Sequence, residues 1–467
     1  MAATFDVAVI GAGVVGAAVA RALSGFDLRT VLVDAGPDVG TGTSKANTAI
    51  LHTGFDAAPG SMEARLLARG YALMSAYSEE AGIAVERTGA CLVAWSEEEA
   101  AQLPAIEEKA GANGCRDVRR LSADDLYGME PHLGPGARGG LLVPGEGILC
   151  PFTAPLAMAT EAVVNGVELR LDCRITSISS EGALHVLAGG AETIAARWVV
   201  NAAGLESDTI EALVGRRRFR VRPRRGELIV YDKLARRLLS RVILPVPTKK
   251  TKGVLVAPTV FGNVLLGPTA TDIDDKEDRS TTREGLAFVL ARGARILPAL
   301  VGEEVTATYA GLRAATESSD YQIHFDPVSR YLCLGGIRST GLSASLGIAE
   351  HAIELLSGPL PMPVKRDRKK IRMPPLGESM VRPYEDAALI ARDPEYGRIV
   401  CHCERVTAGE IRDALRAPVP ARGLEGLRRR TRCLQGRCQG FYCLGSLVSL
   451  AARETGRPAP TFLEALA

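Results

Sequence analysis

The chain opens with an apolar run that is interrupted by glycines. Residues 5–10 (FDVAVI) have the apolar pattern of a buried strand, and residues 14–23 (VVGAAVARAL) continue as an Ala- and Val-rich segment of helical length. A second short apolar run follows at residues 30–33 (TVLV). The pattern predicts a strand, a glycine turn, a helix and a second strand, which together form a β-α-β unit.

The predicted turn has the glycine spacing of a dinucleotide-binding site. Gly11, Gly13 and Gly16 form G-x-G-x-x-G, and Asp34 follows 23 residues after the first glycine, at the end of the second strand. In such a unit the glycines permit the tight turn, the approach of a pyrophosphate and the packing of helix on strand. The helix N-terminus offers N–H groups to the anion, and the acid binds a ribose. We therefore expect a dinucleotide here, but the motif does not separate NAD from FAD.

Three later segments favour FAD, because an extended flavin must contact distant parts of the chain. They are a loop of small polar residues at 42–57, a strand that runs into Ala-Ala-Gly at 196–208, and a strand that breaks at Gly-Gly before a helix at 331–356. Small residues allow close approach of a cofactor, and the last segment adds a helix N-terminus. With the glycine motif, the expected cofactor-binding residues are Gly11, Gly13, Gly16, Asp34, Thr43, Ser44, Asn47, Thr48, Ala203, Gly204, Gly336, Ile337, Arg338, Ser339, Thr340, Gly341, Leu342 and Ser343.

Strand and helix patterns between these segments predict a second domain. Residues 226–232 (GELIVYD) and 263–269 (NVLLGPT) resemble strands, and residues 284–297 resemble a helix. We expect an α/β protein in which a Rossmann-like FAD-binding domain is interleaved with a mixed-sheet α+β substrate domain. The expected division is an oxidoreductase unit at 1–356, with FAD-binding segments at about 1–80, 150–215 and 330–356 and substrate-domain segments at about 81–149 and 216–329.

The C-terminal part of the chain differs from the rest in composition. Residues 357–397 contain seven prolines and are expected to form a linker, and residues 398–467 are expected to form a small helical domain. The net charge is +2, but residues 398–467 hold twelve Arg and six Asp plus Glu, which gives +6 and leaves −4 for the rest. Because these arginines are interleaved with cysteines and lack an aromatic platform, we expect no nucleic-acid binding.

The overall composition excludes a disordered chain and a membrane-spanning one. Of the 467 residues, 46% are hydrophobic and 24% charged, which is typical of globular proteins. The apolar stretch from Val7 to Ala20 has 14 residues, fewer than the roughly 18 that suggest a membrane helix, and no other run reaches that length. We expect no transmembrane segment and a cytoplasmic location, with peripheral attachment to the inner face of a membrane only through a partner.

Five of the ten cysteines lie close to the C-terminus. Cys401, Cys403, Cys438 and Cys443 form C-x-C and C-x4-C pairs beside Gly, Arg and Gln, which is not the setting of apolar core thiols. Four thiolates suit a [2Fe-2S] cluster or zinc, and because zinc sites more usually contain C-x2-C, we favour [2Fe-2S]. Cys433 is left out of the ligand set.

Three arginines near these cysteines have two possible roles. Arg405, Arg432 and Arg437 could offset the negative charge of a cluster and raise its reduction potential, or they could dock an acidic redox partner.

With these motifs in view, the sequence resembles the FAD-dependent glycerol-3-phosphate dehydrogenases, a branch of the D-amino-acid-oxidase-like flavoproteins. The matching stretches include VAVIGAGVVG, TSKANTAILHTGFDA, RPRRGELIVYDK, YAGLRAATE and GIRSTGLSAS. The tail, with CHCERVTAGEIRDAL and GRCQGFYC, is similar to the bacterioferritin-associated-ferredoxin-like [2Fe-2S] domain. The resemblance implies FAD, a [2Fe-2S] cluster and oxidation of sn-glycerol 3-phosphate to dihydroxyacetone phosphate.

The expected reaction transfers hydride from a carbinol C–H to flavin N5 while a base takes the hydroxyl proton. His52, in the flavin-facing loop, is the best candidate base, because neutral imidazole is abundant at pH 7. Arg313 can offer a planar fork to a phosphate or carboxylate, a role that the resemblance also implies, and its alternative is an ion pair with Glu317. Lys252 is a second candidate for the anion, whereas the arginine run at 216–225 is expected to be a solvated face.

A cluster on the same chain implies that electrons leave by a one-electron route. We expect an electron acceptor protein or a quinone-linked subunit, and hence a possible hetero-oligomer, with oxygen disfavoured as the main acceptor. The alternatives are a dehydrogenase of another hydroxy acid, sugar phosphate or secondary amine of the hydroxyproline or sarcosine type, and a flavin/Fe-S subunit that only transfers electrons.

Overall fold

A mixed sheet with five parallel strands at its centre forms the middle of one half of the molecule. The computed structural model describes residues 4–190, 192–247 and 253–463. Within these residues, β1 pairs in parallel with β2 on one side and β12 on the other, and β9 and β20 extend the sheet in the order β9-β2-β1-β12-β20. The eight strands of this sheet are β1 (Thr4–Ile10), β2 (Thr30–Val33), β9 (Glu168–Arg170), β10 (Ser177–Glu181), β11 (Leu184–Gly189), β12 (Glu192–Asn201), β19 (Gln322–Asp326) and β20 (Tyr331–Gly335).

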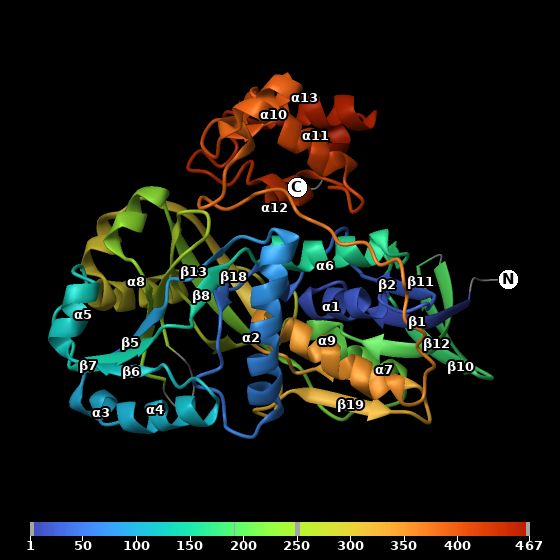
Figure 1. Cartoon of the computed structure of the whole chain (residues 1–467), viewed down its shortest axis with the longest axis horizontal. Coiled ribbons are helices and arrows are strands. Elements are labelled where there is room, and N and C mark those ends of the chain that lie inside the picture. Colours follow the sequence, from blue (N-terminus) through green and yellow to red (C-terminus); the bar gives the residue numbers. More distant parts are fainter. Residues whose placement is uncertain (1–3, 191, 248–252, 464–467) are drawn as a thin grey trace.

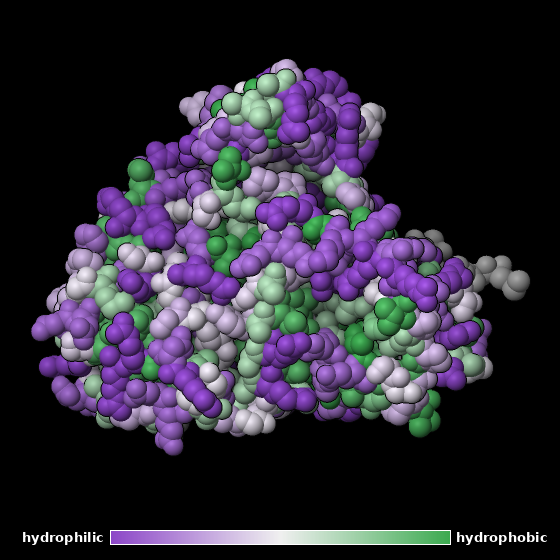
Figure 2. All heavy atoms as spheres, viewed as in Figure 1, coloured by the Kyte–Doolittle hydropathy of each residue, from purple (hydrophilic) through white to green (hydrophobic). Residues whose placement is uncertain are grey.

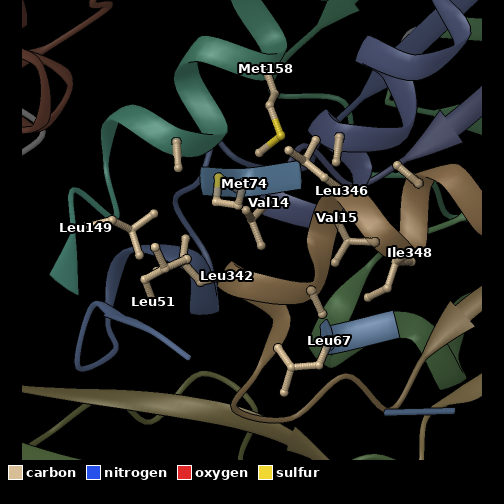
Figure 3. Close-up of a cluster of buried hydrophobic side chains, with 14 of the residues drawn as sticks. Val14, Val15, Leu51, Leu67, Met74, Leu149, Met158, Leu342, Leu346 and Ile348 are labelled. Carbon is tan, nitrogen blue, oxygen red and sulfur yellow. The ribbon is translucent and has the colours of Figure 1, made fainter. Parts of the chain in front are cut away.

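Helices pack tightly beside this sheet. Their bounds are α1 (Val14–Leu23), α2 (Met62–Ala81), α6 (Thr153–Val164), α7 (Ser207–Leu213) and α9 (Gly341–Ser357). A Cβ atom at Gly70 of α2 would lie 2.5 Å from the Ser343 carbonyl oxygen, and one at Gly347 of α9 would lie 2.3 Å from the Leu66 carbonyl oxygen. The two glycines therefore allow α2 and α9 to touch backbone to backbone. Figure 3 shows the buried side chains that gather between these helices, among them Val14, Met74 and Leu346.

A second, mostly antiparallel sheet forms the other half (Figure 1). Its longest pair is β13 with β18, which fixes the register Arg224↔Arg313 and Gly226↔Gly311. The nine strands among the described residues are β5 (Ala90–Ala94), β6 (Arg119–Leu121), β7 (Gly139–Val143), β13 (Arg222–Tyr231), β14 (Val242–Pro245), β15 (Leu255–Pro258), β16 (Val264–Gly267), β17 (Thr271–Asp272) and β18 (Val305–Ala315). The accompanying helices are α3 (Glu97–Ala100), α4 (Leu103–Ala112), α5 (Ala123–Met129) and α8 (Arg283–Ile296).

The two sheets draw on alternating stretches of the chain, so the expected α/β architecture with an interleaved second sheet is confirmed. One strand differs from the expected ranges. β19 falls in the range 216–329 that was assigned to the substrate domain, but it pairs antiparallel with β20 in the first sheet. A third, small sheet joins β3 (Ile50–Leu51), β8 (Gly147–Leu149) and β4 (Val85–Glu86) and links the two halves.

The Pro-rich segment at 357–397 lies against the flavoprotein unit, by which we mean the described residues up to 356. The Pro363 carbonyl accepts from Asp27 N–H, and the Met373 and Glu378 N–H groups donate to Ala81 and Val260 carbonyls. The segment therefore crosses the surface through a series of backbone bonds, as the orange trace in Figure 1 shows. It ends in short helical pieces, η5 (Pro383–Glu385), α10 (Ala387–Arg392) and η6 (Pro394–Tyr396).

The C-terminal unit, which we define as residues 383–463, has its own buried core. Its elements are β21 (Ile399–Cys401), β22 (Val406–Thr407), α11 (Ala408–Arg416), α12 (Leu424–Thr431), α13 (Leu444–Thr455) and α14 (Pro460–Leu463). Thr407 and Glu410 begin α11 with a reciprocal pair of side-chain-to-backbone bonds of 3.2 and 2.9 Å. Because η6 packs on α11, upstream of the expected boundary at 398, the packed unit includes the end of the segment expected as a linker.

Hydrophilic side chains cover most of the face seen in Figure 2, with hydrophobic residues between them in smaller groups. Among the described residues, no helix is long and apolar enough to cross a membrane.

Candidate active site

A large cavity lies between the two sheets, with a volume of about 1010 Å³. Its wall contains residues from nearly every segment that the sequence assigned to cofactor binding. The expected residues on this wall are Gly11, Gly13, Asp34, Thr43, Ser44, Asn47, Thr48, His52, Ala203, Gly204, Arg313, Ile337, Arg338, Ser339, Thr340, Gly341 and Leu342. Gly16, Gly336 and Ser343 are not on the wall, and Lys252 lies outside the described residues.

The glycine turn presents backbone to the cavity, because Gly11 and Gly13 carry no side chains. Gly11 has φ +103°, and a Cβ atom there would lie 2.5 Å from the Ala202 carbonyl oxygen. Although Gly16 is off the wall, a Cβ atom on it would lie 1.8 Å from the Gly11 carbonyl oxygen, so it permits the turn to close against α1. Gly13 caps α1, whose first N–H, at Val14, donates to the Ser44 hydroxyl at 2.9 Å. This helix N-terminus at the cavity wall fits a dinucleotide diphosphate.

Asp34 is held rigidly at the end of β2. Its two carboxylate oxygens accept from the Ala12 and Gly36 N–H groups at 2.6 and 2.7 Å. Burial raises the pKa of Asp34, and the two backbone hydrogen bonds oppose that rise. The position suits an acceptor for ribose hydroxyls.

The polar loop after β2 is fastened to β18, more than 260 residues away in sequence. Thr43 Oγ1 donates to the Leu312 carbonyl at 2.8 Å, and Tyr309 donates to the Asn47 carbonyl at 2.7 Å. A Cβ atom at Gly311 would lie 2.0 Å from the Ala46 carbonyl oxygen, so the loop can lie flat on the strand only because this position is glycine.

His52 meets a buried carboxylate that the sequence did not single out. Leu51 of β3 pairs with Gly147 of β8, so the residues just beyond, His52 and Glu146, face one another. His52 Nδ1 lies 2.9 Å from Glu146 Oε1, and the Glu146 side chain has no exposed surface. The Thr53 N–H and hydroxyl both donate to the same Glu146 oxygen at 2.7 Å. Glu146 is thus a fixed acceptor that orients the imidazole.

The other nitrogen of His52 also faces a carboxylate. Nε2 lies 3.0 Å from Asp56 Oδ1, whose side chain is 9% exposed. Because an ionised carboxylate only accepts hydrogen bonds, Glu146 fixes a ring hydrogen at Nδ1, and Asp56 occupies the hydrogen-bonding position at Nε2. The backbone N–H of His52 donates to the Ser343 hydroxyl at 2.8 Å. Ser343 therefore supports His52 from behind the cavity wall.

Arg313 brings an uncompensated positive charge to the cavity. No carboxylate among the described residues forms an ion pair with it, and its guanidinium donates to the Thr269 carbonyl at 3.3 Å. Burial and the charge of Arg224 lower its pKa to about 10, so the group remains cationic at pH 7. Arg313 is partly exposed and lines the cavity. The alternative partner, Glu317, accepts instead from Arg220 N–H at 3.2 Å.

The turn before α9 is stabilised by polar contacts with α2 and β18–β19. Thr340 donates to Glu63 Oε1 at 2.7 Å and contacts the Tyr321 hydroxyl at 2.7 Å. Arg338 reaches Glu63 Oε2 at 3.4 Å and also donates to the Ser319 carbonyl. Gly336 turns the chain with φ +63° but stays off the wall.

The expectation that residues 216–225 form a solvated face is wrong for Arg225, which is 8% exposed, and several arginines of this run form ion pairs. Arg218 pairs with Glu211 at 2.8 Å, Arg224 with Asp272 at 2.6 Å, and Arg225 with Asp278 at 2.7 Å. The topology supplies these acids from other elements, which the local charge pattern does not reveal.

The four expected cluster ligands come together as two pairs. The thiols of Cys401 and Cys443 are in hydrogen-bond contact, and so are those of Cys403 and Cys438. The contact with Cys443 lowers the pKa of Cys401 to about 6, and a backbone N–H from Tyr442 lowers that of Cys438. Two thiolates for each of two irons is the arrangement that a [2Fe-2S] cluster needs.

Among the described residues, no group of three or more Cys, His, Asp and Glu side chains could hold a single metal ion. Cys433 is fully buried, and burial raises its pKa to about 12.

The three arginines near these cysteines are largely engaged with the rest of the protein. Arg432 contacts Glu404 at 3.3 Å and lies 4.1 Å above the Phe261 ring. Arg437 pairs with Asp232 and Glu304, both at 3.1 Å, and Arg405 approaches Glu378 at 3.7 Å. Arg432 and Arg437 therefore join the C-terminal unit to the flavoprotein unit, and Arg405 joins it to the Pro-rich segment.

Comparisons with known proteins agree with this geometry. The model of the FAD dependent oxidoreductase family matches residues 6–355, three quarters of the chain. The chain belongs to this family. Residues 399–453 match the BFD-like [2Fe-2S] binding domain. FAD and a [2Fe-2S] cluster are thus the cofactors of this family member, and the cavity and the paired cysteines fit them.

Individual relatives cover nearly the whole chain or its flavoprotein unit. A glycerol 3-phosphate dehydrogenase from Caloramator mitchellensis is 34% identical over 97% of this chain and 95% of its own length. One subunit of the anaerobic glycerol-3-phosphate dehydrogenase of Escherichia coli K12 is 28% identical over 96% of this chain and 88% of its own. A solved structure of dithionite-reduced L-α-glycerophosphate oxidase from Mycoplasma pneumoniae with FAD bound aligns with a TM-score of 0.75 and 29% identity, over 80% of this chain and 99% of that one.

Proposed function

We propose that this chain is a dehydrogenase that oxidises sn-glycerol 3-phosphate to dihydroxyacetone phosphate. The observation that carries the proposal is a cationic Arg313 without a carboxylate partner among the described residues, on the same cavity wall as His52. An anion bound by Arg313 would supply the missing counter-charge, and a hydroxyl elsewhere on the same molecule would then lie near the imidazole. The names of the relatives support a glycerol phosphate as this anion.

The protein residues then divide the chemistry between binding and proton transfer. Arg313 binds the phosphate, with Lys252 as a second candidate. His52 accepts the hydroxyl proton at Nε2, because Nδ1 is occupied by Glu146, and the substrate hydroxyl takes the place of Asp56 at that nitrogen. When bound, the flavin supplies the hydride acceptor at N5. Glu146 stabilises the imidazolium that results.

The expected cofactor-binding residues hold FAD in this proposal. The wall residues of the glycine turn, the 43–48 loop and the turn before α9 contact the dinucleotide, while Gly16, Gly336 and Ser343 shape those segments from behind. Cys401, Cys403, Cys438 and Cys443 hold the cluster, which supplies a one-electron exit. The acceptor would be a carrier protein or a quinone-linked subunit, consistent with a relative that is itself one subunit of an enzyme, and peripheral membrane association would come through that partner.

An anaerobic substrate panel tests the proposal. Purified protein would be mixed with sn-glycerol 3-phosphate, its enantiomer, glycerol, L-2-hydroxyglutarate, hydroxyproline or sarcosine, and bleaching of the flavin band would be followed. We expect rapid bleaching with sn-glycerol 3-phosphate alone. Bleaching by a hydroxy acid or a secondary amine instead would identify that compound as the substrate. Bleaching by none of them would favour a subunit that only transfers electrons.

A further experiment separates dehydrogenase from oxidase. Hydrogen peroxide and dye reduction would be measured under air with the preferred substrate. We expect peroxide production far below dye turnover, whereas matching rates would make oxygen the acceptor.

A further inference from the structure

Helix α12 of the C-terminal unit is bonded to the loop that follows the ribose-binding acid. Arg429 Nη2 lies 2.7 Å from Asp38 Oδ2, and Arg430 binds both oxygens of Asp38, at 2.6 and 2.8 Å. Asp38 is only 3% exposed and lies four residues after Asp34. Two guanidinium groups thus meet one buried carboxylate, which makes this a strong contact between the two units.

The backbone of α12 also comes close to the same acid. A Cβ atom at Gly426 would lie 3.1 Å from Asp38 Oδ2. Beyond the C-terminal end of the helix, Arg432 donates to Asn263 Oδ1 at 3.1 Å and stacks on Phe261. Contacts at Asp38 and at Asn263 therefore hold α12 at two separate points of the flavoprotein unit.

Held in this way, α12 becomes part of the FAD cavity. Glu425 and Arg429 lie on the same wall as Gly13, Asp34 and Lys45. Arg429 is close enough to Lys45 that its charge adds to the effect of burial in lowering the pKa of that lysine. Lys45 and Arg429, together with the carboxylate of Glu425, thus lie at the Asp34 end of the cavity, where the motif places the adenosine and diphosphate.

We propose that the C-terminal unit closes the adenosine diphosphate end of the FAD cavity through α12, so that docking of this unit and retention of FAD are coupled. Coupling between two binding events is reciprocal: FAD stabilises the docked unit as much as the docked unit stabilises FAD. The oxidase from Mycoplasma pneumoniae has FAD bound although the match spans 99% of that chain and only 80% of this one. The closure is therefore an addition to a flavoprotein unit and not a general requirement for binding.

Dissociation constants for FAD test the coupling in the full-length chain. FAD would be removed, and rebinding to the wild type, R429A and R430A would be measured by flavin fluorescence, with iron content as a check on the cluster. Arg430 is not on the cavity wall, so R430A weakens docking without removing a cavity contact. We expect both variants to raise the dissociation constant about tenfold or more, because each removes charge-assisted bonds of the interface.

The matched control is R453A, on α13 of the same unit. Arg453 has a 60% exposed side chain and pairs only with Glu395 and Glu454 among the described residues. We expect its FAD dissociation constant to stay within about twofold of the wild type. Values for R429A and R430A equal to that of R453A would overturn the closure, and a change in R429A alone would overturn the coupling.

The reciprocal measurement needs no catalytic turnover. Limited proteolysis of residues 357–397 would be timed with and without FAD in the wild type and in D38N. We expect FAD to slow cleavage severalfold in the wild type and much less in D38N, in which the acid that both arginines bind has lost its charge. Equal protection by FAD in both proteins would contradict the proposal.

Discussion

The flavoprotein unit and the C-terminal unit assemble their sites over very different chain lengths. Residues 52, 146 and 313 meet at one cavity, and a loop at 43–48 is fastened to a strand more than 260 residues later. The four cysteines proposed as cluster ligands, in contrast, all fall between Cys401 and Cys443. The cluster site therefore depends on one short stretch that folds around its own core, whereas the active site depends on the pairing of distant strands.

If the two sites form independently, a substitution that disrupts one site should leave the cofactor of the other site bound. The two sites are least independent at the interface around Asp38, because there the C-terminal unit contributes to the cavity wall. Four substitutions test how far the two sites are independent.

The largest effect is expected for C438S. If Cys438 is one of four thiolate ligands, its loss should reduce the iron content to background, because such a cluster is held by cysteine thiolates. FAD content should stay near one per chain, as judged by released flavin. The control is C433A, which removes the buried thiol outside the ligand set and should keep about two irons per chain. Iron loss in C433A and not in C438S would change the ligand assignment.

H52Q should leave both cofactors bound and stop most of the turnover. Loss of the base should lower kcat by roughly 10³-fold, within the range that general-base catalysis contributes. Stopped-flow bleaching of the flavin with sn-glycerol 3-phosphate measures the step directly. A bleaching rate close to that of the wild type would show that another group acts as the base.

R313M should lower kcat/KM for the anionic substrate, by a smaller factor than H52Q lowers kcat. Removing the cation that the anion needs costs about 3 kcal/mol, which corresponds to roughly 10²-fold in kcat/KM. The control is R222M, whose arginine is 59% exposed, pairs with Asp274 and does not line the cavity. If R222M and R313M behaved alike, the loss would reflect general surface charge and not a phosphate site.

E146Q should give the smallest effect and a distinctive one. A lost charge-assisted hydrogen bond costs roughly 1.5 kcal/mol, or about tenfold in kcat. A neutral amide no longer favours the protonated imidazole, so the acid limb of the profile of kcat/KM against pH should move to lower pH. An unchanged acid limb with reduced kcat would show that Glu146 supports the fold and does not position His52.

Comparison of individual residues shows which features the sequence makes visible. Gly11, Gly13 and Asp34 are recognisable because a turn, a helix start and an acid follow one another within one β-α-β unit. Glu146 gives no comparable signal: it stands between two glycines, and only the pairing of β3 with β8 brings it to His52. The acids that neutralise residues 216–225 were missed for the same reason, since they come from other elements.

By itself, the sequence indicated the fold class, the family and the two cofactors, because local spacing reveals glycine turns and cysteine pairs and several stretches resemble a known family. Tertiary structure alone decided that Arg313 has no carboxylate partner among the described residues, that Glu146 holds the imidazole and that α12 lies on the FAD cavity. These three features depend on which charged groups the fold brings within a few ångströms of one another. Strand register and domain docking set those distances, and neither is a property of neighbouring residues in the chain.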